Sequence, residues 1–383
     1  MMVYENFYDH QLILYDSDGN TGIPDQSVVY GPYLAVRTGT VLNGYDTVSR
    51  KQIYTVNYDD EDALVLLGQY EDHAVFLHIR TDTGDMNAIL QTISTGEITA
   101  RIPLHMHDYY FDEGILQIYA DLYGEDDPVR TKREMLEAQY AVLSNIILYD
   151  NRLYYHGYEE PDVIRCLDIF TGEETAVNVQ LAPEQSLLDG SYAGDLSALS
   201  ISGKGTLWAK VSEPGHEVRS VLISEEDGSV QIIEDSAAGN LPGIWNTQGT
   251  LCALSGSGTV LISDVQGKIQ SRIPFVGRSV WAMHWLNDGT LVLCYPGGIL
   301  QNISIQGEVL HEVQMSCTEQ RYVGPSSFRF AEYGHFLAVY CQDTLEMISA
   351  LALVRPTVEI TTSAPSHRPR RLAGSCMSAA TAS

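Results

Sequence analysis

Short apolar runs separated by polar turns recur along the chain, and the pattern is most regular between residues 204 and 314. Three copies of the phrase Gly-Thr-Leu begin at Gly205, Gly249 and Gly289, which are 44 and 40 residues apart. A second turn glycine follows each copy, at Gly228, Gly267 and Gly307. This period predicts a repeated unit of several short strands joined by turns.

The same pattern extends toward the N-terminus in a looser form. Gly44 lies 52 residues before Gly96, and Gly96 lies 76 residues before Gly172, which is almost two repeats. The apolar runs between these glycines predict strands at 33–36, 41–46, 52–56, 63–67, 74–79, 88–93, 98–102, 152–155 and 163–169. Four short strands per repeat of this length are typical of β-propeller blades. We therefore predict an all-β fold, a single β-propeller of seven or eight four-stranded blades over residues 1–354.

Three segments depart from the repeat. We suggest that the lone strand expected at residues 11–15 closes the last blade, because a propeller must complete its ring. Residues 124–139 are predicted to form a helical insertion, since Arg130–Gln139 contains good helix formers and neither Gly nor Pro. Residues 355–383 are rich in Ser, Ala, Pro and Arg, and they are predicted to be a disordered tail.

One repeat contains the phrase Leu-Asp-x-x-Thr-Gly-Glu at residues 167–173. This phrase resembles the repeats of quinoprotein-like propellers, and residues 93–97 match the same repeat in part. Residues 281–291 are similar to the entry of a WD-type blade, without the Gly-His and Trp-Asp signatures of WD repeats. Residues 175–178 lack the tryptophan that follows the phrase in the quinone enzymes. The resemblance therefore implies a propeller scaffold without quinone chemistry, and we expect no cofactor.

The chain has 383 residues and a formal net charge of −28, with 50 acidic and 22 basic side chains. A surface with this much negative charge repels phosphate backbones and anionic lipids, which argues against nucleic-acid and membrane partners. No stretch approaches the ~20 apolar residues of a membrane helix, and residues 1–6 do not resemble a signal peptide. The six cysteines form no Cys-x-x-Cys pair, which favours reduced, buried thiols. We therefore expect a cytoplasmic, monomeric protein.

His105 and His107 are the candidate metal ligands. Alternate residues of a strand lie on one face, so a strand here would bring both imidazoles together, with Asp108 beside them. A zinc site needs one or two further ligands that the sequence does not locate. The alternative is that both histidines pack at the edge of a blade.

Arg130, Lys132 and Arg133 form a basic cluster in an otherwise acidic chain. Long insertions in repeat scaffolds are often functional loops, so these residues are the candidate contacts for a protein partner. The alternative is that they offset the acidic residues at 125–127.

No nucleotide-binding loop, serine-hydrolase elbow or zinc-protease motif occurs in the chain. This absence favours a non-enzymatic scaffold for protein–protein interaction. A propeller enzyme, such as a hydrolase or lyase, can instead gather a site in the central channel from the side chains of different blades. A propeller that binds a small ligand or a metal ion is the third alternative, and His105 and His107 alone support it.

Overall fold

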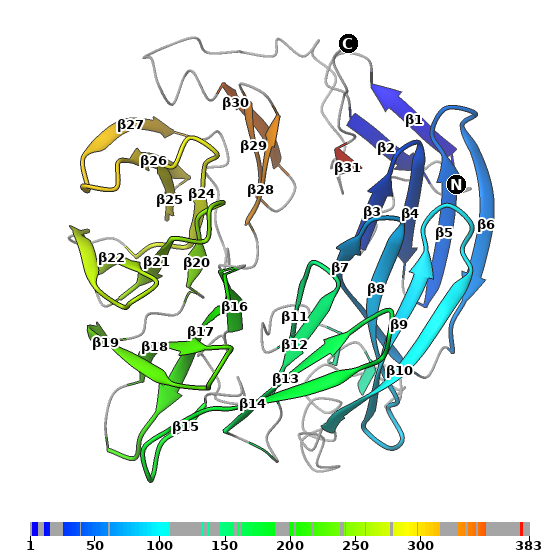
Figure 1. Ribbon diagram of the computed structural model, residues 1–383. Coiled ribbons are helices and arrows are strands. Elements are labelled where there is room, and N and C mark those ends of the chain that lie inside the picture. Colours follow the sequence, from blue (N-terminus) through cyan, green and yellow to red (C-terminus); the bar gives the residue numbers. More distant parts are fainter. Residues whose placement is uncertain are drawn as a thin grey trace, which may run out of the picture. The chain divides into compact units, whose positions relative to one another are not determined.

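In the computed structural model, the strands coincide with the apolar runs of the sequence, and every element with assigned bounds is a strand (Figure 1). The strands are rich in Val, Ile, Leu and Tyr, whose side chains suit a pleated, half-buried surface. The structure describes residues 2–6, 11–15, 26–38, 40–59, 62–107, 132–133, 136–137, 146–156, 160, 162–187, 199–202, 204–215, 218–237, 241, 243–256, 258–275, 279–296, 298–314, 328–333, 336–341, 344–349 and 376–377.

The chain divides into two compact units, each with its own sheets and its own apolar clusters. The first contains Met1–Val179, Asp189–Ser197 and Cys376–Ser383, and the second contains Gln180–Leu188 and Ala198–Ser375. Every four-stranded sheet lies wholly within one unit, so the division falls between sheets rather than through one.

Three four-stranded antiparallel sheets in the first unit follow the chain order, so that each strand pairs with the next. The first sheet contains β3 (Gln26–Tyr30), β4 (Tyr33–Thr38), β5 (Val41–Asp46) and β6 (Lys51–Asn57). The second sheet contains β7 (Ala63–Tyr70), β8 (His73–Ile79), β9 (Asp85–Thr92) and β10 (Ile98–His107). The third sheet contains β11 (Ile146–Tyr149), β12 (Arg152–Tyr155), β13 (Val163–Asp168) and β14 (Glu174–Asn178).

The second unit repeats this plan, and each Gly-Thr-Leu copy leads into β17, β21 or β25, as the period predicted. One sheet contains β15 (Ser186–Leu187), β17 (Thr206–Ser212), β18 (Arg219–Ser224) and β19 (Val230–Ala237), with β16 (Leu199–Ile201) also paired to β17. The next contains β20 (Ile244–Trp245), β21 (Leu251–Ser255), β22 (Thr259–Asp264) and β23 (Ile269–Pro274). It is followed by β24 (Ala282–Trp285), β25 (Leu291–Tyr295), β26 (Ile299–Ile303) and β27 (Val309–Gln314). A three-stranded sheet contains β28 (Phe328–Tyr333), β29 (Phe336–Cys341) and β30 (Thr344–Ser349).

The strand expected at residues 11–15 is present as β2 (Gln11–Tyr15). It belongs to a three-stranded sheet, in which it pairs with β1 (Met2–Asn6) and with β31 (Cys376–Met377). Its part in closing the last blade stays a prediction. β31 is the only part of the predicted disordered tail, residues 355–383, that the structure describes, and those two residues form a strand.

The turn between the third and fourth strands of each four-stranded path contains a residue with positive φ. Five of the six residues are glycines, which adopt this conformation without the steric cost that a Cβ imposes. They are Gly96, Gly172, Gly228, Gly267 and Gly307, with φ between 70° and 86°. In the first sheet the corresponding residue is Arg50, with φ 57°. Gly44 lies inside β5, which confirms the strand predicted at residues 41–46.

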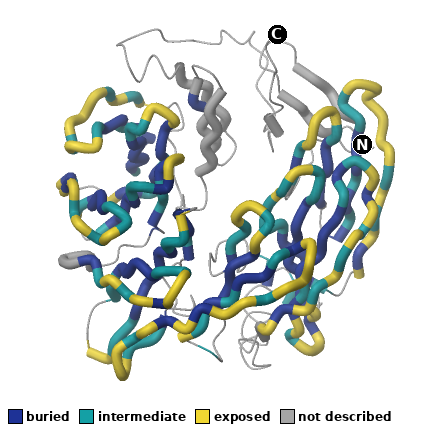
Figure 2. Tube along the Cα trace, in the orientation of Figure 1, coloured by how far each residue is buried: buried dark blue, intermediate teal, exposed yellow. Residues whose placement is uncertain are grey.

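Apolar side chains between adjacent sheets form the core of the first unit. One cluster joins the first and second sheets and includes Leu42 and Phe76. Another joins the second and third sheets and includes Val75 and Leu153. Because β8 has a neighbouring sheet on both sides, six of its seven residues are buried, whereas the outer strand β6 has no buried residue (Figure 2).

The second unit has the same kind of core between its sheets. One cluster includes Trp208 of β17 and Cys252 of β21, and another includes Ile262 of β22 and Leu293 of β25. Gly243 leaves room for Trp208, because a Cβ at this position would lie 2.7 Å from the indole ring. Cys166, Cys252 and Cys294 are buried free thiols, which confirms the expectation for these three cysteines.

Candidate functional site

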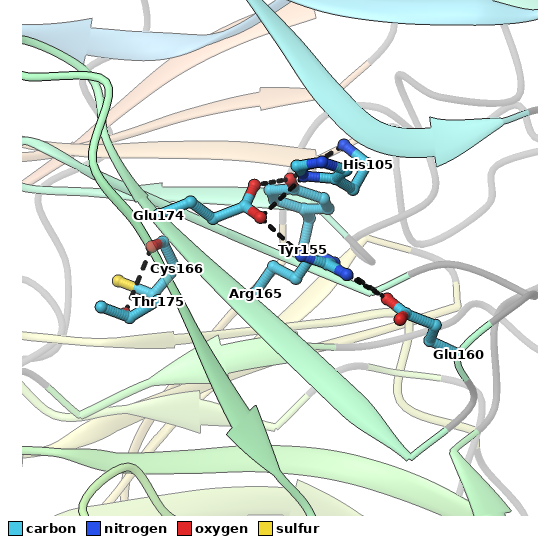
Figure 3. A network of polar contacts seen from close by, with 7 residues as sticks. All are labelled: His105, Tyr155, Glu160, Arg165, Cys166, Glu174 and Thr175. Atoms are coloured by element: carbon cyan, nitrogen blue, oxygen red, sulfur yellow. Dashed lines mark hydrogen bonds and ion pairs between the residues drawn. The ribbon is translucent and has the colours of Figure 1, made fainter.

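A polar network joins the second and third sheets of the first unit (Figure 3). Glu174 Oε1 lies 2.7 Å from His105 Nδ1 and accepts a hydrogen bond of 2.5 Å from Arg165 Nη1. Glu174 Oε2 accepts a hydrogen bond from the Tyr155 hydroxyl. Arg165 also donates to Glu160 Oε2, at 2.9 Å from Nε and 2.5 Å from Nη2. We call these five residues the Glu174 joint.

The register of the strands explains how this network assembles. Tyr155 of β12 is paired with Arg165 of β13, so the phenol and the guanidinium start from neighbouring positions. Glu174 opens β14 directly after a turn in which Asp168 Oδ1 accepts the backbone N–H groups of residues 170 and 171. His105 comes from β10 of the second sheet, and its backbone N–H donates to the Tyr155 hydroxyl at 3.1 Å.

Burial and hydrogen bonding shift the pKa of Glu174, the acid at the centre of the joint, in opposite directions. The Glu174 side chain is 15% exposed, and burial alone would raise its pKa. The hydrogen bonds from Tyr155 and Arg165 favour the carboxylate and lower the pKa of Glu174 overall. Burial, followed by the hydrogen bond to Glu174, raises the pKa of Tyr155 well above its ordinary value. At neutral pH the joint therefore contains an ionised carboxylate and a neutral phenol.

The groups of the Glu174 joint bond to one another. Both oxygens of Glu174 accept hydrogen bonds from side chains of the joint, and Arg165 donates to two carboxylates, those of Glu174 and Glu160. A general acid or base needs a group that reaches the reacting atoms of a substrate. In this arrangement the charges are used to connect two sheets, so the joint has the character of a structural contact.

The structure describes the side chain of one of the two predicted metal ligands. His105 lies on β10, where its ring contacts Glu174 and its side chain is 68% exposed. His107 ends the same strand, but the register of β10 on β9 shifts between Pro103 and His107. Within the described ranges, no three His, Cys, Asp or Glu side chains are arranged to hold a metal ion. The metal site at His105 and His107 stays a prediction.

The predicted partner-binding cluster is described only in part. Arg130 lies outside the described residues, whereas Lys132 and Arg133 have helical backbone and half-buried side chains. Apart from these two residues and residues 136–137, the predicted insertion at 124–139 also lies outside the described residues. The insertion and its role in partner binding therefore stay predictions. No helix in the described part of the chain is long and apolar enough to cross a bilayer.

Leu136 and Glu137 attach this segment to the sheets. Leu136 is 1% exposed and belongs to the cluster between the second and third sheets. Glu137 Oε1 accepts a hydrogen bond from Arg37 Nη1 at 3.1 Å and another from the backbone N–H of Leu64 at 3.2 Å. Arg37 is 4% exposed, and removing a carboxylate that faces a buried cation is strongly destabilising. These two residues are therefore part of the core of the first unit.

A second candidate site is the surface made by six turns of the first unit, which we call the turn face. Its turns connect β3–β4, β5–β6, β7–β8, β9–β10, β11–β12 and β13–β14. In an antiparallel sheet of four sequential strands, the first and third turns lie at the same end. In each sheet one backbone hydrogen bond connects these two turns. The N–H groups of Thr47, Ile93 and Ile169 donate to the carbonyls of Pro32 (2.8 Å), Asp72 (2.9 Å) and Asn151 (3.0 Å), respectively.

Contacts between neighbouring sheets make these turns one surface. The ring of Phe170, from the third sheet, lies 5.8 Å from that of Tyr70 and 5.2 Å from that of His73, both from the second sheet. Gln69 Nε2 of the second sheet donates to the carbonyl of Val29 in the first sheet at 2.8 Å. The turns of the three sheets are therefore adjacent.

Exposed large apolar side chains gather on the turn face. Among the described residues of the first unit, five such side chains are exposed, and four of them lie in these turns or on the strand residue directly before one. They are Tyr30, Val48, Tyr149 and Phe170, with exposures of 42%, 81%, 38% and 49%. Figure 2 shows the turns as exposed ends of strands whose middle parts are buried. Exposed apolar side chains on the same end of three adjacent sheets make this surface a candidate for binding another molecule.

None of these turn-face residues was predicted from the sequence as part of a site. A signal for them exists, because Tyr30, Tyr70 and Tyr149 each precede a two-residue turn. The first residue of each of these turns has positive φ, at Gly31, Glu71 and Asp150. Since only one of the three is a glycine, a pattern based on glycine spacing does not reveal the repeat.

No protein-family model matches the chain, and no curated protein matches it in sequence. The solved structures that it resembles are β-propellers. The Dos1 propeller matches with a TM-score of 0.53 and 14% identity, over 88% of this chain and 82% of that one. Hsv2 of Kluyveromyces lactis matches with a TM-score of 0.51 and 10% identity, over 82% of this chain and 89% of that one. These likenesses confirm the β-propeller fold, while the number of blades stays a prediction.

Proposed function

We propose that this chain is a non-enzymatic β-propeller scaffold that binds a protein partner through the turn face of its first unit. The supporting observation is the group of exposed apolar side chains at Tyr30, Val48, Tyr149 and Phe170. Apolar side chains on turns that are tied to rigid sheets offer a partner contact area at low entropic cost. The charged groups of the Glu174 joint bond to one another, which leaves the turn face as the better candidate for function.

Affinity capture from a native cell extract, read by mass spectrometry, tests this proposal. The intact chain is compared with a Tyr30→Ser/Val48→Ser variant and with a Val309→Ser/Leu310→Ser control. The control removes two apolar side chains of β27 that are 54% and 40% exposed. We expect a reproducible partner that the control retains and the turn-face variant loses. Capture of no partner by the intact chain contradicts the scaffold, and equal capture by both variants contradicts the turn face as the contact.

We also propose Arg130, Lys132 and Arg133 as a second contact of the same scaffold. Deleting residues 124–139 is a poor test, because Leu136 and Glu137 belong to the core of the first unit. Replacing the three basic residues by serine keeps both core contacts. Loss of the captured partner by this triple variant, at an unchanged melting temperature, supports the second contact, and full retention of the partner contradicts it.

A further inference from the structure

Part of the turn face combines exposed aromatic rings with exposed carboxylates. This part contains the turns of the second and third sheets, residues 70–73, 93–97, 149–152 and 168–173, and we call it the acidic turn face. We propose that it binds a segment of a partner protein that is rich in lysine and arginine. The proposal rests on the scaffold function proposed above and names the chemistry of the partner.

Phe170 is the apolar centre of the acidic turn face. Its side chain is 49% exposed, and the planes of Tyr70 and His73 meet its ring at 63° and 86°. Edge-to-face contacts of this kind hold an aromatic ring in one orientation. The exposed surface of Phe170 is therefore presented to a ligand with little side-chain entropy left to lose on binding.

The charges around this ring are almost all negative. The four turns contain six acidic residues and one basic residue, Arg152. Two of the acids are already engaged, because Asp72 accepts hydrogen bonds from Ser94 and Asp168 accepts the backbone N–H groups of its own turn. The other four are exposed, and they are Glu71, Glu97, Asp150 and Glu173.

Lysine and arginine side chains match both properties of this surface. Their methylene stems pack on apolar side chains while the charged ends stay in water. Their cations are attracted to an aromatic ring face and to carboxylates nearby. The net charge of −28 also draws cationic ligands toward the chain, but it does so over the whole surface. A test must therefore separate the local site from the overall charge.

The second unit provides matched controls for this purpose. Ile305 occupies the position of Phe170 in the equivalent turn of its sheet, two residues before the positive-φ glycine, and is 38% exposed. Glu226 is an exposed acid in another equivalent turn. Away from the acidic turn face, Ile305→Ala removes an exposed apolar side chain at the position equivalent to Phe170, and Glu226→Lys makes the same charge reversal as Glu173→Lys.

The experiment measures binding of a fluorescein-labelled peptide of six Arg-Gly repeats to the full chain, by fluorescence anisotropy in 150 mM NaCl. We expect Phe170→Ala and Glu173→Lys each to weaken binding about 5- to 10-fold, the size of a lost cation–π contact or charge pair. Ile305→Ala and Glu226→Lys should change the affinity less than about 2-fold. Melting temperatures check that all four variants remain folded.

Equal weakening by Glu173→Lys and Glu226→Lys would show that only net charge matters, and this result overturns the proposal. Absence of measurable binding to the intact chain also overturns it. If the intact chain captures a partner from an extract and Phe170→Ala captures it equally, the scaffold stands and the acidic turn face is refuted as its basic-segment site. If the peptide series gives the expected pattern but no partner is captured, the cationic site stands and the scaffold function is refuted.

Discussion

Between the first and second sheets of the first unit, the phenol ring of Tyr54 covers two glycines, whereas between the second and third sheets the charged Glu174 joint makes the contact. A Cβ at Gly44 would overlap the Tyr54 ring, and one at Gly96 would lie 2.5 Å from its Cδ2 atom. We call these two contacts between sheets the Tyr54 seam and the charged seam. At the charged seam, the glycine equivalent to Gly96 is Gly172, and a Cβ added to it would have no neighbouring residue within 4 Å.

The difference teaches that one fold can join its sheets by shape or by charge. The Tyr54 seam depends on volume, because a ring fits only where two side chains are missing. The Glu174 joint depends on protonation and on pairing, since its acid is held ionised by the groups it binds. The first seam should therefore respond to substitutions that add atoms, and the second to those that remove charge.

The largest expected effect is at the volume-dependent seam. Gly96→Ala places a side chain at φ +76° and drives its Cβ into the Tyr54 ring, which should destabilise the first unit by about 3 kcal/mol. Gly172→Ala has the same backbone penalty without the overlap and should cost about 1 to 2 kcal/mol. Equilibrium urea unfolding measures both, and equal losses would contradict the difference between the seams.

The next effect is at the charged seam. Glu174→Ala leaves Arg165, Tyr155 and His105 without their shared acceptor, and we expect a loss of about 2 kcal/mol. Glu160→Ala removes a carboxylate that is 45% exposed, so it should cost less than about 1 kcal/mol. The same urea titration applies, and a larger loss for Glu160→Ala would show that the joint is not centred on Glu174.

A smaller effect isolates the polar part of the Tyr54 seam. The Tyr54 hydroxyl donates to the carbonyl of Ile93 at 2.8 Å. Tyr54→Phe keeps the ring over both glycines and removes this bond, which should cost about 1 kcal/mol. A loss as large as that of Gly96→Ala would mean that the hydroxyl, rather than the shape of the ring, holds this seam together.

The smallest effect is a pH dependence that only the charged seam should show. Because the pKa of Glu174 is lowered from 4.5, its stabilising contribution is complete above about pH 4.5 and is lost as the pH falls through the lowered value. The stability difference between the intact chain and Glu174→Gln should therefore shrink between pH 7 and pH 3. The difference for Tyr54→Phe should stay constant over this range, and parallel behaviour of the two variants would contradict the assignment.

The fold could be predicted from the sequence because its turns need a residue with positive φ at regular intervals. Glycine fills five of the six equivalent positions, so the repeat is visible as a spacing. In the first sheet the residue with positive φ is Arg50 instead of a glycine. The glycine of this sheet that entered the spacing, Gly44, is required for another reason, because the Tyr54 ring packs directly on it. Conformation and packing both favour glycine, and spacing alone does not distinguish these two reasons.

The candidate sites were harder to predict from the sequence than the strands. His105 and Glu174 are 69 positions apart, and their contact depends on the packing of two sheets. Phe170 reads as an ordinary residue of a turn, and its pairing with Tyr70 becomes visible only when the turns of neighbouring sheets are placed together. The pattern of strands predicts where the chain reverses direction, but it does not predict which turns lie next to one another in the fold.

The backbone hydrogen bonds that tie the paired turns of the first unit have a consequence for how this surface changes over generations. Main-chain atoms make these ties, so an exposed side chain such as Val48 is not needed to hold the paired turns of its own sheet together. Exposed turn residues of this kind can therefore change over generations, or be randomised in a library, one at a time while the strands and their pairing are kept. In this respect the turns act like the variable loops of an antibody on a constant framework.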